Sequence, residues 1–440
     1  MFRRRAVRRA VRGRIGVRTG SREQPTARRR DRTEEGLTPV TATTATVFRN
    51  VRPYGADRAV DLFAADGLLV ERLPAGADPL VVEGEGRIAL PTLVDAHIHP
   101  DKTAWGEPWY GRRPAGSLPE YVGGDVDLYR RQRTPLAARA QRLLAHAVAC
   151  GTRAVRAHVD VAPAYGLDGV TGLAEARERL APALDVQLVA FPQHGVRRTP
   201  GTAELLAEAA ASGLIDAVGG IDPAGFDGGP DGEGPAQLDL VFDLAERHGL
   251  QLDVHLHDRG ERGLGPLRDI LARTRAAGLA GRVVVSHAFC VPELADERLT
   301  DLADELAEAG VGLTTVAPSA HQMLPFRELQ SHGVRVGLGS DGVRDSWSPY
   351  GNADMLHRAH LLGWTTGART DEELSDCFAL AADGGADLLD LPRVTLRPGS
   401  PADFMLLPGE CLPQIVVDLP PRDVVVHAGR VVARDGRFLG

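Results

Sequence analysis

Residues 92–103 read TLVDAHIHPDKT and place two histidines, His97 and His99, at the end of a short apolar run. Residues i and i+2 of a β-strand point to the same face of a sheet, so the run predicts a strand that carries both imidazoles on one side. Two neutral imidazoles on one face suit a borderline divalent metal such as Zn²⁺ or Fe²⁺. A lone His-x-His pair is a weak signal, because hydrogen-bonded core histidines are common. The rest of the chain has to decide between a metal site and a core pair.

Seven further apolar runs follow, and segments with helical spacing separate them. The eight runs are residues 92–99, 153–161, 185–193, 218–223, 250–258, 282–289, 311–318 and 334–341. The helical segments include residues 135–149, 203–212, 238–248, 266–277 and 296–309. Strands that alternate with helices predict a parallel sheet, and eight such units predict an α/β fold of the (β/α)8 TIM-barrel type. The structural rival is a doubly wound open sheet.

Polar residues stand at or near the ends of six runs: His99, Asp160, Gln193, His257, His287 and Asp341. In a TIM barrel the carboxyl ends of all strands meet on one face, where the active site lies. An open sheet would not bring the ends of so many strands to one place. The barrel is therefore favoured, and the additional histidines and the aspartate favour a metal site over a core pair.

The segments on either side of the barrel are rich in short β-type runs broken by Gly and Pro. Residues 40–90 and 395–440 predict a small composite β-sandwich built from both flanks, and residues 91–394 the barrel. Residues 1–36 hold 13 arginines against four acidic residues and little to bury, which predicts a disordered tail. Nucleic-acid binding or organelle targeting by this tail are the alternatives.

The charge and cysteine content narrow the class of protein further. The formal net charge is −8, and outside the tail acidic residues outnumber basic ones, so the barrel is not expected to bind nucleic acid. No apolar run approaches the length of a membrane span. The four cysteines form no closely spaced pair, which argues against a zinc ribbon or a disulfide framework. A reducing cytoplasm is the simplest compartment.

Several motifs, in the expected order, resemble the amidohydrolase superfamily and, within it, the cytosine deaminase branch. They are DAHIHPDKT (95–103), VRAHVDV (155–161), LVAFPQHGV (188–196), LDVHLHD (252–258), VVSHA (284–288) and GSDGVRDSWSPYGNADML (339–356), with GSPADFMLLPG (399–409) and VVVHAGRVVARDGRF (424–438) in the C-terminal flank. The resemblance covers roughly residues 40–440. It implies a metal-dependent hydrolase, and it implies self-association as a homo-oligomer.

By this resemblance, one divalent metal ion, zinc or iron, is bound by His97, His99, His255 and Asp341. His287 would orient the bound water or the substrate, and Asp341 would also accept a proton from the attacking water. A metal lowers the pKa of bound water toward ~7, and neighbouring acids and bases then relay protons.

The single lysine of the chain, Lys102, bears on the number of metals. Binuclear relatives in the superfamily bridge two metals with a carboxylated lysine on the fourth strand. The fourth run here, residues 218–223, reads VGGIDP and holds no lysine. One catalytic metal per chain is therefore expected. Lys102 lies three residues after His99, which makes it a candidate for a substrate contact; a solvated loop charge is the alternative.

Substrate contacts are expected from Gln193, Lys102, His158 and Trp347. Gln193 matches a family glutamine that recognises the ring amide of the substrate, because an amide both donates and accepts. His158 is placed with these at the end of the second strand, where a supporting role behind the ligands is the alternative. Trp347 follows the eighth strand and could wall a flat ring; packing is the commoner role of tryptophan.

The chain departs from the cytosine deaminase pattern at two positions. The family places a catalytic glutamate three residues after the fifth-strand histidine, where this chain has Asp258, with Glu261 as a weaker alternative. His257 lies between the fifth-strand histidine, His255, and Asp258, and its side chain either points inward or bonds locally. The second acidic residue after the eighth-strand aspartate is Gly342 here, which argues against cytosine itself as the substrate.

These features predict an enzyme that hydrolyses a C–N bond, other than a peptide bond, of a small nitrogen heterocycle. The favoured reaction is hydrolytic deamination of an aminopyrimidine, aminotriazine or related cyclic amidine, with Asp258, His287 and Asp341 as catalytic residues. Hydrolysis of an endocyclic amide or of an N-alkylamino group is the alternative within the enzyme class. A non-catalytic metal-binding scaffold is the alternative outside it.

Overall fold

The computed structural model describes residues 45–112, 114–228, 236–317, 319 and 322–440. The predicted Arg-rich tail, residues 1–36, lies outside these ranges. Within them, eight parallel strands form one sheet in which each strand pairs with its neighbour in the sequence. These are β6 (Leu93–Ile98), β7 (Thr152–Asp160), β8 (Asp185–Phe191), β9 (Ala217–Ile221), β10 (Gln251–His255), β11 (Val283–Ser286), β12 (Val311–Thr315) and β13 (Val336–Leu338).

The sheet closes on itself where its first strand meets the segment after its last. Ile98 at the end of β6 forms a parallel bridge with Asp341, three residues beyond β13. The Asp341 amide donates to the His97 carbonyl at 2.8 Å. The predicted (β/α)8 barrel is therefore confirmed, and the two predicted ligand segments meet at its seam.

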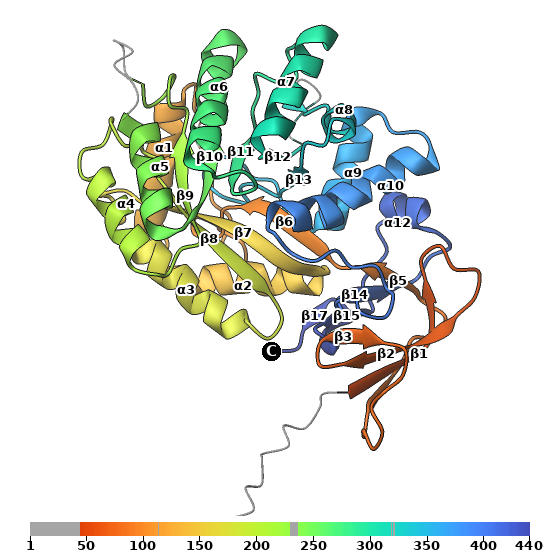
Figure 1. The fold of residues 1–440 in the computed structure, drawn as a ribbon. Coiled ribbons are helices and arrows are strands. Elements are labelled where there is room, and N and C mark those ends of the chain that lie inside the picture. The colour runs from red at the N-terminus through yellow and green to blue at the C-terminus, as the bar shows by residue number, and fades with distance from the viewer. Residues whose placement is uncertain (1–44, 113, 229–235, 318, 320–321) are drawn as a thin grey trace, which may run out of the picture. The chain divides into compact units, whose positions relative to one another are not determined.

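Helices alternate with these strands and cover the outside of the barrel (Figure 1). In the described ranges they are α2 (Leu136–Ala149), α3 (Asp168–Leu180), α4 (Thr202–Ala211), α5 (Ala236–His248), α6 (Gly260–Ala277), α7 (Asp296–Ala309) and α8 (Phe326–Ser331). An additional helix, α1 (Leu118–Arg131), precedes α2. After β13 follow α9 (Met355–Thr366), α10 (Asp371–Ala379), a π-helical turn (Leu380–Gly384), α11 (Gly385–Leu388) and α12 (Leu412–Asp418). No helix in these ranges combines the length and apolarity that crossing a membrane requires.

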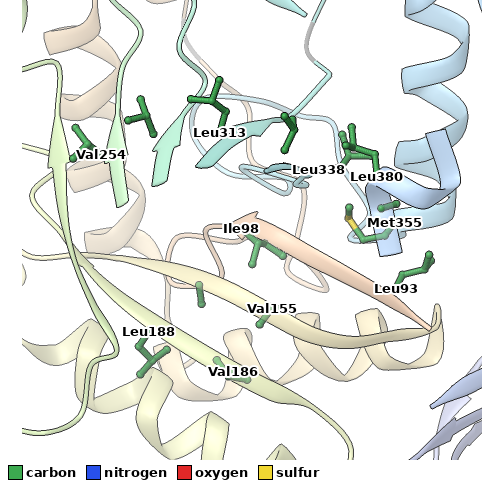
Figure 2. Packing of buried hydrophobic residues seen from close by; sticks show 14 of the residues in the cluster. Leu93, Ile98, Val155, Val186, Leu188, Val254, Leu313, Leu338, Met355 and Leu380 are labelled. Atoms are coloured by element: carbon green, nitrogen blue, oxygen red, sulfur yellow. The ribbon is translucent and has the colours of Figure 1, made fainter. Parts of the chain in front are cut away.

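Apolar side chains fill the layer between the strands and the helices. Figure 2 shows part of this core, with Leu93, Ile98, Val155, Val186, Leu188, Val254, Leu313, Leu338, Met355 and Leu380 labelled. Burying side chains of this kind contributes roughly 1.5–3 kcal/mol each before conformational entropy is subtracted. The core makes the barrel a rigid support for the residues at its open end.

The N-terminal end of the barrel is closed by α11. A Cβ placed on Gly312 of β12 or on Gly337 of β13 would lie 2.4 Å or 2.6 Å from a methyl carbon of Leu388. Leu388 therefore occupies the space that two side chains would take, and it packs with Ala96, Ala154 and Val284. The open end of the barrel is consequently the opposite one, where the polar residues lie.

The two flanks of the barrel form a second, mainly antiparallel sheet. Its strands are β1 (Ala45–Pro53), β2 (Val60–Ala65), β3 (Leu68–Val70), β4 (Leu80–Glu83), β5 (Ile88–Pro91), β14 (Phe404–Leu407), β15 (Val424–His427), β16 (Arg430–Arg434) and β17 (Arg437–Phe438). Strand β5 pairs with β14, so the N- and C-terminal segments are joined by backbone hydrogen bonds. The rings of Phe48 and Phe404 meet edge to face at 4.8 Å in the separate core of this domain.

Candidate active site

A cavity of about 570 Å³ opens at the C-terminal ends of the barrel strands. Strand β6 is followed by His99 and β10 ends on His255, while His287 and Asp341 follow β11 and β13, and all four line the cavity. Because four strands of a closed barrel supply these groups, residues far apart in the sequence face one another.

Three imidazoles and one carboxylate meet at the floor of this cavity. The Nε2 atoms of His99 and His255 are 3.3 Å apart, and Asp341 Oδ1 lies 3.4 Å from His99 Nε2 and 3.6 Å from His97 Nε2. His97, His99 and Asp341 form a group compact enough to hold a metal ion, as do His97, His255 and His287. The structure thus brings together all four residues that the sequence predicts as ligands.

The donor atoms of this cluster fit a divalent cation. The nitrogens that converge are His97 Nε2, which is buried without a hydrogen-bond partner among the described residues, and the Nε2 atoms of His99 and His255, which face each other. Burial lowers the pKa of His99 and of His255 well below the usual histidine value, with further lowering by Lys102 and by His97 respectively. The two imidazoles are therefore neutral near pH 7, which is the form that binds metals. Neutral nitrogens that converge on a carboxylate are a typical donor set for zinc or iron.

A serine beneath the cluster fixes the proton position on His97. The hydroxyl of Ser286 donates to Asp253 Oδ1 at 2.6 Å, so its oxygen is left to accept from His97 Nδ1 at 2.9 Å. His97 consequently carries its proton on Nδ1 and presents a lone pair on Nε2. Asp253 is in turn paired with the fully buried Arg156 at 3.2 Å. This chain of contacts holds His97 from below, as outer partners of metal-binding histidines commonly do.

The strand ends that carry His287 and Asp341 have an unusual backbone. His287, Ala288 and Asp341 have φ angles of 70°, 46° and 60°, in the left-handed region that side-chain-bearing residues rarely adopt. Such conformations cost of order 1–3 kcal/mol each and cluster at functional sites. Both ring nitrogens of His287 are buried and have no hydrogen-bond partner in the part of the chain that the structure describes. Burial lowers the pKa of His287, with a further contribution from His257.

Lys102 lies beside the cavity in a network of acceptors. Its Nζ atom is 3.5 Å from Asp125 of α1, 3.1 Å from Asp160 of β7 and 3.0 Å from Gln193 Oε1. Burial opposes the charge on Lys102, but the carboxylates of Asp125 and Asp160 outweigh it and hold its pKa well above the usual value. Its ammonium is thus a buried, paired cation rather than a solvated one.

Two other predicted substrate contacts, Gln193 and Trp347, line the same cavity. Because Gln193 Oε1 accepts from Lys102, the Gln193 NH₂ group remains as a donor. The Trp347 indole N–H donates to Asp125 at 2.6 Å, and Lys102 lies 5.8 Å from the centre of its ring. Both side chains are therefore held in place by the Lys102–Asp125 pair.

The residues after β10 divide between the cavity and its surroundings. His257 lines the cavity, and its Nδ1 lies 2.8 Å from Asp222 Oδ2. Burial opposes protonation of His257, but Asp222 outweighs it and raises the His257 pKa. Asp258 is not among the cavity-lining residues that the structure describes; its carboxylate lies against Gly225, and burial raises its pKa, with a further contribution from Asp222.

His158 lies deeper in the barrel than the cavity. Its ring centre is 4.0 Å from that of His97, and its Nε2 is 3.8 Å from Asp253. It is fully buried and is not among the described cavity-lining residues. The side chain of His158 therefore contacts the proposed metal ligand His97 and also Asp253, which holds His97 through Ser286.

Four residues of the site were not singled out by sequence alone: Asp125, Asp222, Ser286 and Asp345. Ser286 precedes His287 in the VVSHA motif, so the motif itself was the available signal. Asp222 directly follows β9 and stands near the end of the fourth predicted run, so its place at a strand end was an available signal. Asp345 comes from a loop and Asp125 from the additional helix α1, where strand spacing gives no indication of direction.

A closed parallel barrel with a histidine and aspartate cluster at its C-terminal face defines a class of barrel hydrolases with a candidate metal centre. Residues 81–438 match the sequence model of the family described as "Amidohydrolase family". The chain belongs to this family. This match and the relatives described next confirm two predictions. The chain is a member of the amidohydrolase superfamily, and it is an amidohydrolase that acts on carbon–nitrogen bonds.

One solved structure and two further relatives resemble this chain over most of its length. The crystal structure of N-isopropylammelide isopropylaminohydrolase from Burkholderia multivorans ATCC 17616 has 37% sequence identity and a TM-score of 0.83, covering 90% of this chain and 100% of that one. The N-isopropylammelide isopropyl amidohydrolase of Pseudomonas sp. (strain ADP) is 29% identical over 80% of this chain and 88% of its own. The pterin deaminase of Rhizobium rhizogenes (strain K84 / ATCC BAA-868) is 26% identical over 90% and 92%.

Proposed function

We propose that the protein hydrolyses the bond between a ring carbon and an exocyclic nitrogen of a small, flat nitrogen heterocycle, releasing an amine. The observation that carries this proposal is the convergence of His97, His99, His255 and Asp341 at the floor of a cavity large enough for a small molecule. The relatives named above, which are named for acting on heterocycles, support it.

One divalent metal, zinc or iron, would be held by His97, His99, His255 and Asp341. When bound, it would supply a water of lowered pKa and polarise the ring carbon that is attacked. The neutral imidazoles and the lone pair fixed on His97 Nε2 support this ligand set. A single site is favoured because the compact groups found among the described residues all share His97 and because the fourth strand holds no lysine.

The proton transfers are assigned to groups of this chain. Asp341 would accept the proton of the attacking water, and His287 would orient that water through a ring nitrogen that has no other described partner. His257, held by Asp222 and facing the cavity, would deliver a proton to the leaving amine. This assignment gives His257 the step that the sequence pattern suggested for Asp258, because the Asp258 carboxylate lies against Gly225.

The substrate ring would lie against Trp347, with Gln193 reading its edge. The Gln193 NH₂ group donates to a carbonyl or ring nitrogen, since its oxygen already accepts from Lys102. Lys102 would act mainly by orienting Gln193.

An N-alkylamino substituent is favoured over a bare amino group as the leaving group. Beyond the polar floor, the cavity is bordered by the apolar side chains of Val316, Ala317 and Leu361, which could contact an alkyl chain. Two of the relatives named above are named for an isopropyl-bearing substrate, and the third for deamination. Deamination, which the sequence favoured, is therefore the second candidate.

A cytoplasmic location agrees with four cysteines that form no disulfide.

Mass spectrometry of a substrate panel tests the proposal. Protein reconstituted separately with zinc and with iron is incubated with aminotriazines, aminopyrimidines and pterins, each with a bare and an isopropyl-substituted amino group. Release of isopropylamine supports the first candidate, and release of ammonia alone supports deamination. A ring-opened acid, or no product from any compound, would overturn the proposal.

His97→Ala should lose both bound metal and turnover. The matched control is His332→Ala, because His332 bonds to Asp304 at 2.7 Å outside the cavity. It should retain both. Full turnover by the His97 variant would exclude the proposed metal centre.

A further inference from the structure

Gly342 leaves a space beside Asp341 that another residue fills. The backbone at Gly342 is not in the left-handed region, so its conformation does not require glycine. A Cβ at this position would, however, lie 1.9 Å from Asp345 Oδ2. The Asp345 carboxyl therefore stands where a side chain of residue 342 would begin. It is 2% exposed and lines the cavity.

The other oxygen of Asp345 is used to hold this position. Asp345 Oδ1 accepts hydrogen bonds from the backbone amides of Trp347 and Ser348, each at 2.9 Å. Asp125 of α1 in turn accepts from the Ser346 hydroxyl and from the Trp347 indole. The loop is thus fixed from both sides, and Oδ2 is left over Gly342 at the wall of the cavity.

With Oδ1 occupied by the two amides, Oδ2 is the oxygen of Asp345 that can meet a ligand. It can donate and accept a hydrogen bond when the carboxyl is protonated, and it accepts when the carboxyl is ionised. Burial raises its pKa to about 7, the charge of Asp125 adds to the rise, and Lys102 opposes it. A ring that carries an N–H next to a carbonyl presents the complementary donor and acceptor. An amino group next to an unprotonated ring nitrogen presents a donor and an acceptor as well, whereas a ring whose nitrogens all carry alkyl groups presents no N–H.

We propose that Asp345 determines substrate specificity by binding a ring edge with an N–H beside an acceptor atom, at the place that Gly342 leaves free. This deepens the proposed function and rests on it. The substrate class becomes a heterocycle that carries an N–H beside a carbonyl or a ring nitrogen, in addition to the exocyclic amine that leaves. Gly342 is required because any larger residue would displace the Asp345 carboxyl.

The first test uses Asp345→Asn, Asp345→Ala and Gly342→Ala on the metal-loaded protein. For a turned-over substrate with such an edge, each should raise KM at least tenfold with a smaller change in kcat. Gly342→Ala should act through Asp345, so the double variant Gly342→Ala/Asp345→Ala should be no worse than either single variant. Additive losses would overturn the proposal, as would an unchanged KM in Asp345→Asn, which keeps an oxygen for the two amides.

The control for the glycine substitution is Gly265→Ala on α6, where an added Cβ meets nothing within 4 Å. It should leave KM unchanged. Thermal midpoints of all variants show whether each one folds. If Gly342→Ala does not fold, Asp345→Asn still decides the question.

A binding measurement separates failure of this inference from failure of the proposed function. Calorimetry compares cyanuric acid, which presents an N–H beside a carbonyl in every orientation, with trimethyl isocyanurate, in which methyl groups replace all three N–H groups. The wild type should bind cyanuric acid more tightly, and Asp345→Asn should lose the preference at least tenfold. If the preference is seen without any turnover, the proposed reaction fails and the role of Asp345 stands. No preference in the wild type overturns the role.

Discussion

At the scale of single residues, the hydroxyl of Ser286 determines which ring nitrogen of His97 carries the proton, although Ser286 is not itself a proposed metal ligand. It donates to Asp253 and accepts from His97 Nδ1, which keeps the His97 Nε2 lone pair free. Removing an outer partner of a metal-binding histidine commonly lowers metal affinity by about 10–100-fold. The chemistry of the site therefore extends below the cavity floor.

Ser286→Ala should weaken metal binding by about one to two orders of magnitude while the fold persists. Competition with a chromophoric chelator measures the affinity, and circular dichroism checks the fold. Ser331→Ala, which removes a hydroxyl bonded to the Glu328 carbonyl on α8, is the matched control and should bind metal normally. Equal affinity in both variants would exclude the positioning role of Ser286.

The raised pKa of Asp345 predicts a pH-dependent cost to stability. The folded protein holds the proton up to a pKa of about 7, whereas the unfolded chain loses it near 3.8. Between these values the folded state binds more protons, so stability falls as pH rises, by at most about 4 kcal/mol from this group at 1.36 kcal/mol per unit. Asp125 raises this pKa, as does Asp341 to a smaller extent, while Lys102 opposes the rise.

Asp345→Asn should therefore gain stability relative to the wild type as pH rises from about 4 to 7, with no further gain above. Urea unfolding at a series of pH values measures the difference. A constant difference across this range would mean that Asp345 titrates normally.

At the scale of elements, Lys102 joins parts of the chain that are distant in sequence. It contacts Asp125 on α1, Asp160 on β7 and Gln193 after β8. Without it, buried carboxylates would lack a counter-charge, which typically costs about 3–5 kcal/mol. The lone lysine thus organises one wall of the site.

Lys102→Met should reduce the free energy of unfolding by about 3–5 kcal/mol at pH 7, and by less at low pH, where the carboxyls take up protons. Denaturant unfolding at two pH values tests this. Lys102→Arg keeps the charge and should lose less. A Met variant as stable as the wild type would show that the network is not a net stabilising feature.

The elements also show what sequence alone could reach. Alternating apolar runs identified all eight barrel strands, because buried parallel strands read as near-continuous Val, Leu and Ile. The pair His97 and His99 followed from strand geometry. Helix α1 was not predicted, since it contains Gly123 and Gly124 and few apolar residues. Its Asp125 was therefore missed as well.

The conformations of the loops are the other part of the site that could not be predicted from the sequence. Asp345 reaches the cavity through a turn whose path depends on the Trp347 and Ser348 amides and on Asp125. No periodicity encodes such a path. The placement of Asp258 outside the cavity and of His257 within it likewise depends on the bonds that both backbone amides make to Asp222.

At the scale of the whole molecule, the metal cluster should contribute to stability. His97 Nε2 has no hydrogen-bond partner among the described residues, and the Nε2 atoms of His99 and His255 face each other. A ligand that binds only the folded state stabilises it by about 2.7 kcal/mol when its free concentration is one hundred times its Kd. Chelation should therefore lower the thermal midpoint, and returning zinc or iron should restore it.

Calorimetry with metal content measured in parallel checks this expectation. The His97→Ala variant serves as the control, because it should show no shift on chelation. A wild-type midpoint that stays constant while the metal is lost would mean that the cluster is stable without an ion.

The seam of the barrel has a consequence for how the protein is made. His97 is synthesised early, but its seam partner Asp341 comes only after the last barrel strand, and β5 pairs with β14 later still. A nascent or truncated chain that stops before residue 341 cannot assemble the ligand cluster. The ability to retain metal therefore reports that translation has passed the seam, which offers a simple way to distinguish complete molecules from fragments in a preparation.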